Sequence, residues 1–417
     1  MSAYSSTNDE LQGESVSGPT LVIIGASLAG VRAAEGARRD GFGGDIVLVG
    51  EEDCLPYDRP PLTKQVLAAG NDFDGRPLRS ETTLRDELGL TIHLGVRATG
   101  VDPSARVVST TSGDLDFDAL VIATGCRARP APPNLAGSAV HTIRTATDAR
   151  NLRLDLDRAS SVAIVGAGFI GCEVASAASV RGLDVTLIEA ASAPLVRVVG
   201  SEASEGFTQL HAAHGVRLKT GTTVDGLEMR PTQSELVLSD GDRVVADVVV
   251  VAIGTLPNTE WLTGSGLDLS DGIVCRSDLG VGISGIAAAG DVCQWTDPRW
   301  GGRSSRREHW TNAAEQGPHA ARTALNSDHH EPFSSIPYFW SEIHGHRVQL
   351  IGRTDGTESL TLGSLDAGDY MTLYRNEDQL HGVLTVGPTA HTAKFRTLLA
   401  EAGSWSNALE TAVSMLP

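Results

Sequence analysis

Two glycine-rich segments follow apolar runs in this chain, and residues of these types at this spacing could hold the pyrophosphate of a dinucleotide. The first spans residues 25–30 (Gly-Ala-Ser-Leu-Ala-Gly) after the run 21–24, and the second spans 166–171 (Gly-Ala-Gly-Phe-Ile-Gly) after 162–165. Glycines permit a tight turn from strand to helix, and amide N–H groups at the helix N-terminus bind phosphate oxygens. Because a chain that binds two dinucleotides can pass electrons between them, we expect redox chemistry.

An acidic residue ends the next predicted strand after each glycine-rich segment. Residues 45–50 lead to Glu51, and residues 184–188 lead to Glu189. A carboxylate at this place accepts hydrogen bonds from ribose hydroxyls and repels a 2′-phosphate, so Glu189 predicts a preference for NADH over NADPH. Ser27 stands where the first segment should have its second glycine, but serine is small and weakens that site little.

Composition and charge limit the partners and the compartment. The formal net charge of −19 argues against binding to nucleic acid or to an anionic membrane. The longest apolar run, 244–253, is short and contains Asp247, so we expect no transmembrane helix. Residues 1–19 are polar and serine-rich, which predicts a disordered leader rather than a signal peptide and, by default, a cytoplasmic protein.

The cysteines and histidines lack the spacing of a redox dithiol or a metal site. The five cysteines are scattered and contain no Cys-x-x-Cys pair, which is typical of thiols in a reducing compartment. His211 and His214 could share one face of a helix, but no carboxylate or cysteine pattern accompanies them. We therefore expect neither a dithiol mechanism nor a bound metal.

The order of the elements predicts an α/β fold with an internal repeat. Each half runs from a glycine-rich segment through a polar hairpin to an apolar strand that ends in a small-residue turn, and continuous Val/Ile runs are typical of central parallel strands. We expect two Rossmann-like dinucleotide-binding domains and a C-terminal α+β domain, in which antiparallel strands precede one helix. The predicted ranges are 20–127 with 255–330 for the first domain, 128–254 for the second and 331–417 for the third.

Several further segments carry a family resemblance. They are Pro56–Lys64, Ala123–Gly125, Gly290–Asp291, Trp310–Gln316 and Tyr338–Ser341. With them, the chain from about Thr20 onward resembles the FAD-dependent NADH:ferredoxin reductases of the putidaredoxin reductase-like type, which serve cytochrome P-450 monooxygenases or ring-hydroxylating dioxygenases. The resemblance implies a glutathione-reductase-like architecture and a C-terminal interface domain. It also implies that NADH gives a hydride to FAD and that electrons leave singly to an iron–sulfur ferredoxin.

The same resemblance assigns residues to the two cofactors. The implied FAD site comprises Gly25, Ser27, Leu28, Ala29, Gly30, Glu51, Arg59, Lys64, Ala98, Ala123, Thr124, Gly125, Arg129, Arg144, Asp291 and Trp310. The implied NAD site comprises Gly166, Gly168, Phe169, Ile170, Gly171, Glu173, Glu189, Arg197 and Gly254. Among these residues, Lys64, Glu173 and Trp310 are the expected catalytic group.

Glu173 has two possible roles. Two residues past the second glycine-rich segment, in the expected first turn of a helix, a carboxylate interacts favourably with the helix dipole, and this could be its whole purpose. The resemblance implies instead that Glu173 pairs with Lys64. We hypothesise a partly buried ion pair beside the flavin that positions the nicotinamide.

Two other kinds of protein share this scaffold. NADH oxidases, peroxidases and disulfide reductases use a cysteine near the flavin, and Cys54 lies in a comparable region but lacks their Ser-Cys-Gly setting. Apoptosis-inducing factors share the domains and the Pro-Pro-Leu segment and act partly as binding proteins. Their nucleic-acid contacts require basic surfaces, and the net charge of −19 counts against that.

The docking surface for the ferredoxin is the least defined part of the sequence. An acidic reductase that meets an acidic partner needs a local basic patch, and Arg306 and Arg307 directly precede the Trp310 segment. We expect these two arginines to contribute to docking, although a solvated run of charges would look the same. We expect a monomer or a weak homodimer.

Overall fold

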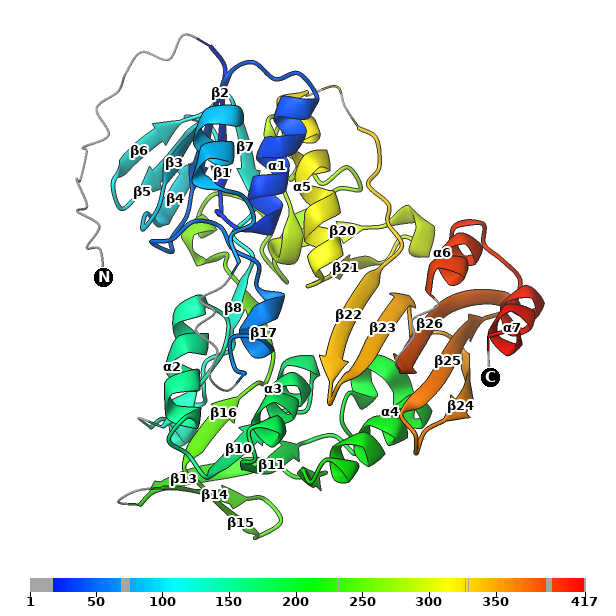
Figure 1. Cartoon of the computed structure of the whole chain (residues 1–417). Helices are drawn as coiled ribbons and strands as arrows, with labels where there is room; N and C mark the ends of the chain where they lie inside the picture. Colours follow the sequence, from blue (N-terminus) through cyan, green and yellow to red (C-terminus); the bar gives the residue numbers. More distant parts are fainter. Residues whose placement is uncertain are drawn as a thin grey trace. The chain divides into compact units, whose positions relative to one another are not determined.

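The protein is described here from a computed structural model, which covers residues 18–68, 76–137, 139–230, 233–326, 328, 330–387 and 392–415. The predicted disordered leader, 1–19, lies outside these residues apart from its last two positions. The chain divides into two compact units (Figure 1). The first unit draws on 1–58, 77–126 and 257–335, and the second on 59–76, 127–256 and 336–417.

The first unit is built around a parallel sheet. Its five strands lie in the order β19-β7-β1-β2-β3, so the segment that is last in the sequence lies at one edge. The strands are β1 (Thr20–Ile24), β2 (Asp45–Val49), β3 (Leu90–His93), β7 (Ala119–Ile122) and β19 (Ile286–Ala288). This arrangement confirms that a late segment of the chain completes the first Rossmann-like sheet.

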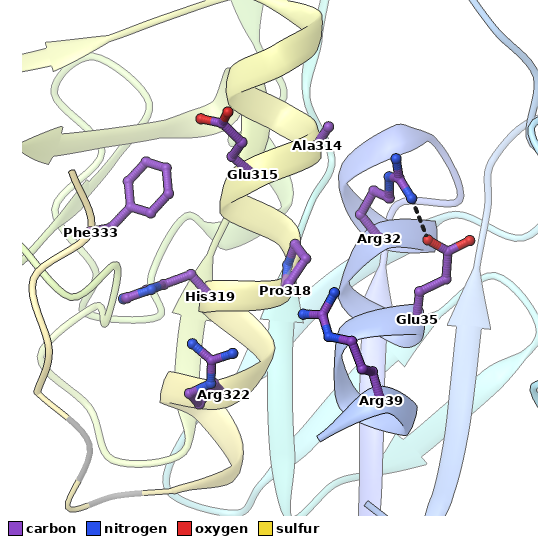
Figure 2. A pocket seen from close by; sticks show the side chains of 9 residues that line it. All are labelled: Arg32, Glu35, Arg39, Ala314, Glu315, Pro318, His319, Arg322 and Phe333. Carbon is purple, nitrogen blue, oxygen red and sulfur yellow. Dashed lines mark hydrogen bonds and ion pairs between the residues drawn. The ribbon is translucent and has the colours of Figure 1, made fainter. Parts of the chain in front are cut away.

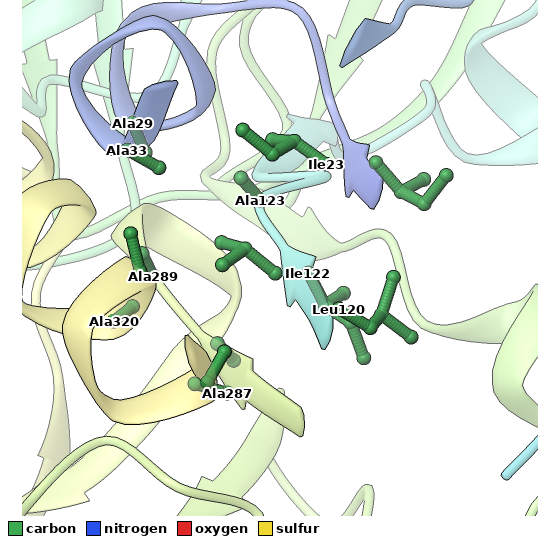
Figure 3. Packing of buried hydrophobic residues seen from close by; sticks show 14 of the residues in the cluster. Ile23, Ala29, Ala33, Leu120, Ile122, Ala123, Ala287, Ala289 and Ala320 are labelled. Carbon is green, nitrogen blue, oxygen red and sulfur yellow. The ribbon is translucent and has the colours of Figure 1, made fainter. Parts of the chain in front are cut away.

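Two helices, α1 (Leu28–Arg39) and α5 (Trp310–Leu325), lie side by side against this sheet (Figure 1). Figure 3 shows how alanines of both helices meet the branched side chains of the strands. The two helices cross so closely that only glycine fits at the crossing. A Cβ atom at Gly36 would stand 2.6 Å from Pro318 Cα, and one at Gly317 would stand 2.4 Å from the carbonyl oxygen of Ala29. Small residues therefore set the spacing of this layer.

The remaining elements of the first unit are short. One antiparallel sheet contains β4 (Ala98–Asp102), β5 (Val107–Thr110) and β6 (Gly113–Asp116). Another small sheet contains β18 (Ile273–Cys275), β20 (Cys293–Thr296) and β21 (Ser304–Arg306). The short helices are η2 (Thr83–Glu87), η4 (Glu260–Leu262), η5 (Gly290–Val292) and η6 (Pro298–Trp300). The chain passes between the units at β8 (Cys126–Ala128) and β17 (Thr255–Pro257), and also after residues 58, 76 and 335.

The second unit contains a second parallel sheet, in the order β12-β11-β10-β16-β9. Its strands are β9 (Val140–His141), β10 (Ser161–Val165), β11 (Asp184–Glu189), β12 (Arg217–Thr220) and β16 (Val248–Val251). A hairpin sheet contains β13 (Val224–Met229), β14 (Ser234–Leu238) and β15 (Arg243–Ala246). The helices are η1 (Pro60–Thr63), η3 (Pro133–Leu135), α2 (Ala146–Leu156), α3 (Phe169–Val180) and α4 (Val196–Ala213).

The C-terminal part of the second unit is an antiparallel sheet in the order β22-β23-β26-β25-β24. Its strands are β22 (Tyr338–Ile343), β23 (His346–Gly352), β24 (Glu358–Ser364), β25 (Asp369–Asn376) and β26 (Gln379–Gly387). The predicted sheet is confirmed, but the prediction of one helix after it was wrong. Two helices, α6 (Thr392–Ala400) and α7 (Trp405–Val413), follow the sheet, because Ala402 takes a left-handed conformation with φ of 53° between them.

The predicted α/β fold class is therefore confirmed. The division into three separate domains stays a prediction, since the compact second unit includes both 127–256 and 336–417. It also includes 59–76, which the sequence pattern placed with the first glycine-rich segment.

A cluster of four histidines joins α4 to the turn between β22 and β23. His344 Nε2 lies 2.9 Å from His211 Nδ1, and the rings of His214 and His344 stack at 4.2 Å. His346 packs edge-on against His214. In the part of the chain that the structure describes, His211 Nε2 and His344 Nδ1 are buried without a hydrogen-bond partner. Burial, with the neighbouring histidines, lowers the pKa of His211 to about 4 and that of His344 to about 3.

This cluster predicts a loss of stability in acid. A histidine whose pKa is lower in the folded protein binds a proton more readily when unfolded, so stability falls as the pH drops below the unfolded value of about 6.5. We expect His211 alone to cost about 2 kcal/mol between about pH 7 and pH 5. Equilibrium unfolding across this range should show a shallower decline for His211→Gln than for the unsubstituted protein. The exposed His330→Gln should retain the full decline, and equal slopes for both variants would contradict the assignment.

Candidate functional site

The first glycine-rich turn joins β1 to α1 in the first unit. Gly25 has φ of +120°, and a Cβ atom there would stand 2.1 Å from the carbonyl oxygen of Ala123. A Cβ atom at Gly30 would stand 2.0 Å from the carbonyl oxygen of Gly25. Ser27 is the N-cap residue of α1, and Leu28 and Ala29 begin the helix. The turn therefore presents backbone at a helix N-terminus, as a bound pyrophosphate requires.

Several other predicted residues of the first unit are held around the ends of its sheet. Thr124 Oγ1 donates to the carbonyl of Asn258 at 2.9 Å, and Asn258 Nδ2 donates to the carbonyl of Thr124 at 2.9 Å. Gly290 N donates to Gln316 Oε1 at 2.8 Å, and the short helix η5, which contains Asp291, packs against α5. Sequence reasoning missed Asn258, and it quoted Gln316 only as part of a family segment.

Trp310 begins α5, and its indole Nε1 donates to Asp58 Oδ1 at 2.7 Å. Asp58 belongs to the Pro56–Lys64 segment, so two of the segments that carried the resemblance meet in the first unit. Ala98 is buried at the start of β4, and Gly125 has φ of +62° after β7. Glu51 is exposed and lies 3.8 Å from Arg97. A role for these residues in binding a cofactor stays a prediction.

Three arginines that the resemblance assigned to the FAD site lie in the second unit. They are Arg59, Arg129 and Arg144. Arg59 Nη1 donates to the carbonyl of Arg144 at 2.7 Å, just before the capped N-terminus of α2. Arg129 is exposed, and its backbone N–H donates to the carbonyl of Gly254, which has φ of +102°. Their assignment to the FAD site stays a prediction.

The second glycine-rich turn joins β10 to α3 and repeats the geometry of the first. Gly166 has φ of +102°, and a Cβ atom at Gly171 would stand 1.9 Å from the carbonyl oxygen of Gly166. Gly168 is the N-cap residue of α3, with Phe169 and Ile170 next, and space for a Cβ atom at Gly168 is open to 4 Å. The open space at the helix N-terminus is a cradle that a phosphate would fit.

Glu189 supports this second turn. Its side chain is 5% exposed, and its carboxylate accepts hydrogen bonds from Ala167 N at 2.7 Å and Ala191 N at 2.8 Å. Arg197, whose side chain is 81% exposed, approaches the same carboxylate at 3.4 Å. The acid at the strand end thus has a structural role that the sequence pattern did not show, because its carboxylate accepts a backbone hydrogen bond from the turn. Its role in binding a ribose stays a prediction.

The predicted ion pair between Lys64 and Glu173 is present in the second unit. Lys64 Nζ lies 2.6 Å from Glu173 Oε1, and the two side chains are 19% and 7% exposed. Glu173 is the fifth residue of α3, so the expectation that it lies in the first helical turn was wrong. Hydrogen-bond donors around the buried carboxylate, rather than the helix dipole, hold Glu173 in place.

Two hydroxyl groups that sequence reasoning missed complete the surroundings of Glu173. Ser341 Oγ donates to Glu173 Oε1 at 2.5 Å, and Thr63 Oγ1 donates to Glu173 Oε2. Both residues stand in quoted family segments, but no spacing in the sequence links them to position 173. The contact arises only when η1 and β22 pack against α3.

Arg307 has a different role from the predicted one. Its side chain is 8% exposed, lies 4.7 Å over the ring of Trp295 and pairs with the fully buried Asp297 at 3.2 Å. It cannot present a charge to a partner, so we correct the docking assignment for Arg307. Arg306 is 12% exposed and pairs with Glu308 at 2.5 Å and Asp271 at 3.3 Å, and its role in docking stays a prediction.

The cysteines are all thiols, and Cys54 is exposed. The spacing of Cys275 and Cys293 in the sequence indicates no relation between them, and their sulfur atoms lie 3.5 Å apart on neighbouring strands. Burial raises the pKa of the Cys293 thiol, which keeps it protonated and unreactive. Over the described ranges, no group of three or more histidine, cysteine or acidic residues could hold a metal ion, and no described helix is long and apolar enough to cross a membrane.

A surface cavity of about 410 Å³ lies between α1 and α5 in the first unit (Figure 2). Its lining includes Arg32, Glu35 and Arg39 from the later turns of α1, and Arg322 from α5. Arg32 and Glu35 form an ion pair at 2.7 Å. The lining contains no residue that the sequence assigned to a cofactor, so this cavity is separate from the glycine-rich turns.

Comparisons with known proteins agree with this geometry. The pyridine nucleotide-disulphide oxidoreductase model matches residues 19–317, and the reductase C-terminal model matches 338–413. The chain is 36% identical to rhodocoxin reductase of Rhodococcus erythropolis, over 92% of this chain and 90% of that protein. It is 35% identical to the ferredoxin reductase component of chlorobenzene dioxygenase from a Cupriavidus species, over 88% of each chain.

A solved structure gives the same result for the fold. The reductase in the covalent putidaredoxin reductase–putidaredoxin complex is 30% identical and superposes with a TM-score of 0.85, over 95% of this chain and 98% of that one. These matches run through both glycine-rich turns and the C-terminal sheet. The chain therefore belongs to the pyridine nucleotide-disulphide oxidoreductase family, in the ferredoxin reductase group that these relatives represent.

Proposed function

We propose that this protein is a FAD-dependent NADH:ferredoxin oxidoreductase that takes a hydride from NADH and passes electrons singly to an iron–sulfur ferredoxin. The ferredoxin would feed a cytochrome P-450 monooxygenase or a ring-hydroxylating dioxygenase. The observation that carries the proposal is the pair of strand–glycine turn–helix cradles, one in each unit. Relatives named rhodocoxin reductase, putidaredoxin reductase and the ferredoxin reductase component of chlorobenzene dioxygenase support it and favour it over a thiol-based oxidase or an apoptosis-inducing-factor-like protein.

The residues at both turns fit a dinucleotide. Side chains are sterically excluded at Gly25, Gly30 and Gly171. Strand and helix can therefore approach closely at both turns, and each helix N-terminus can offer backbone N–H groups to a pyrophosphate. We assign the first turn to FAD and the second to NADH. Bound FAD would supply the redox chemistry, because a flavin accepts a hydride and releases electrons one at a time.

The protein supplies binding, orientation and electrostatics to this chemistry. Lys64 and Glu173 would position the nicotinamide and favour its approach, because a charge pair fixed by several hydrogen bonds needs little reorganisation. Glu189 holds the NADH turn and would repel the 2′-phosphate of NADPH. A cytoplasmic location is part of the proposal, because scattered cysteines without a pairing pattern are typical of reducing compartments.

A reconstitution panel tests the function. The purified, FAD-loaded protein is mixed with NADH, cytochrome c and each candidate ferredoxin in turn. We expect rapid cytochrome c reduction only when one of the ferredoxins is present. Slow NADH oxidation that no ferredoxin accelerates, with a long-lived charge-transfer absorbance, would favour the signalling class of protein on this scaffold.

Lys64→Ala should slow flavin reduction. The substitution leaves Glu173 as a buried charge without its ion-pair partner, so we expect the stopped-flow rate at saturating NADH to fall about 10- to 100-fold. Lys219→Ala is the matched control, because Lys219 pairs with Asp242 on the exposed edge of the same unit. An unchanged rate in the Lys64 variant would remove this pair from the proposed mechanism.

Glu189→Gln should narrow the preference for NADH. The amide keeps one acceptor oxygen but turns an N–H group toward one of the two backbone donors, so kcat/KM for NADH should fall by about 10-fold. Loss of the negative charge should leave NADPH turnover unchanged or higher. Steady-state kinetics with both nucleotides measure the ratio of kcat/KM for NADH to kcat/KM for NADPH. Glu228→Gln on the hairpin sheet is the control. Comparable turnover with NADPH in the unsubstituted protein would contradict the role of Glu189.

A further inference from the structure

Ser341 shares one oxygen atom of Glu173 with Lys64. Ser341 Oγ lies 2.5 Å from Glu173 Oε1, and Lys64 Nζ lies 2.6 Å from the same oxygen. The other oxygen, Oε2, accepts the hydrogen bond from Thr63 Oγ1. Because both carboxylate oxygens are engaged, rotation of the carboxylate would break at least one of three hydrogen bonds to an ionised group.

The position of Ser341 is set by the packing of β22 along one face of α3. Phe339 meets the ring of Phe169 at 4.1 Å, and His344 N donates to Ser176 Oγ at 2.7 Å. In α3, Phe169 lies four residues before Glu173 and Ser176 lies three residues after it. Residues at these spacings lie on one face of a helix, so all three contacts are made by the same face of α3. The strand β22 cannot shift along α3 without breaking all three contacts. The register of β22 on α3 therefore fixes the Ser341 hydroxyl next to Glu173.

The hydroxyl of Ser341 matters to Glu173 because the side chains around this carboxylate are buried. Ser341 is 1% exposed, and Glu173 and Thr63 are each 7% exposed, so water cannot readily replace a lost donor. Lys64 is the most exposed member at 19%, and its ammonium also lies 3.4 Å from the carbonyl of Pro60. Within the described residues, the Lys64 ammonium contacts Glu173 and the carbonyl of Pro60, and it has three N–H groups. It can therefore direct a third N–H group toward a bound molecule.

We propose that Ser341 is a positioning residue for flavin reduction. Its hydroxyl holds the Glu173 carboxylate in the rotamer that receives Lys64, and so it fixes where the Lys64 ammonium stands. The inference rests on the proposed function for the reaction that the pair serves. It does not require Ser341 to touch FAD or NADH.

The first test measures the contact itself, apart from activity. Equilibrium unfolding of the full chain is compared for Ser341→Ala, Glu173→Gln and the double variant. We expect the two changes to be non-additive, with a coupling of about 5-fold or more in the unfolding equilibrium constant. Thr372→Val is the matched control, because Thr372 is a fully buried hydroxyl of the same sheet that bonds to Thr361 instead. It should lower stability and add independently to Glu173→Gln.

The second test asks whether the contact affects the reaction. Stopped-flow reduction by NADH should be about 10-fold slower in Ser341→Ala at saturating NADH, while the dissociation constant for NADH changes by less than about 2-fold. Ser341→Thr, which restores a hydroxyl, should recover most of the rate. Thr372→Val should reduce at the rate of the unsubstituted protein, although it is less stable.

The outcomes separate this inference from the proposed function. Additive unfolding effects, or coupling together with an unchanged reduction rate in Ser341→Ala, would overturn the positioning role of Ser341 while the reductase function stands. Failure of NADH to reduce the unsubstituted protein would overturn the proposed function and, with it, the catalytic meaning of the contact. The coupling in the unfolding experiment would then still decide whether Ser341 orients Glu173.

Discussion

Backbone touches backbone at the two strand-to-helix turns, and the rest of the structure depends on that close approach. At Gly25 and Gly171 an added Cβ atom would stand about 2 Å from a carbonyl oxygen of the turn or of a neighbouring strand end. Only glycine allows the helix to begin so near the sheet, and only then do the amide groups of the turn face outward from a helix N-terminus. The two sheets are ordinary parallel sheets, and the turns are the feature that fits our proposal of dinucleotide binding.

Buried carboxylates, together with their hydrogen-bond donors, hold neighbouring segments of each unit in place. Glu189 accepts two backbone N–H groups next to the second turn, and Glu173 accepts two hydroxyls and an ammonium. Asp297, which is fully buried, pairs with Arg307 and accepts a hydrogen bond from Ser334 Oγ at 2.9 Å. A buried charge is costly unless it is fully hydrogen-bonded, so each carboxylate requires that its donors be in place. This requirement links η1, α3 and β22 in the second unit in addition to their apolar contacts.

Much of the fold follows from local patterns. The Val/Ile runs of β1, β10 and β16 predict buried parallel strands, and the alternating segments after Ile336 predict the antiparallel sheet, as the structure confirms. The ion pair of Lys64 with Glu173 came from the family resemblance and not from spacing. The errors have local causes. One left-handed residue, Ala402, ends α6 and splits the expected C-terminal helix, and Trp295 with Asp297 buries a guanidinium that looked solvated.

By itself, the sequence determined the element types, the two glycine turns and the acids that follow them, because these depend on periodicity and on conformations available to single residues. Tertiary structure decided which distant side chains share an atom. Ser341 lies 168 residues from Glu173, and Cys275 meets Cys293 across two strands. No local pattern encodes such contacts, since they depend on the register with which one element packs on another. That register is set by the summed packing of side chains such as Phe169 and Phe339, and it exists only in the folded chain.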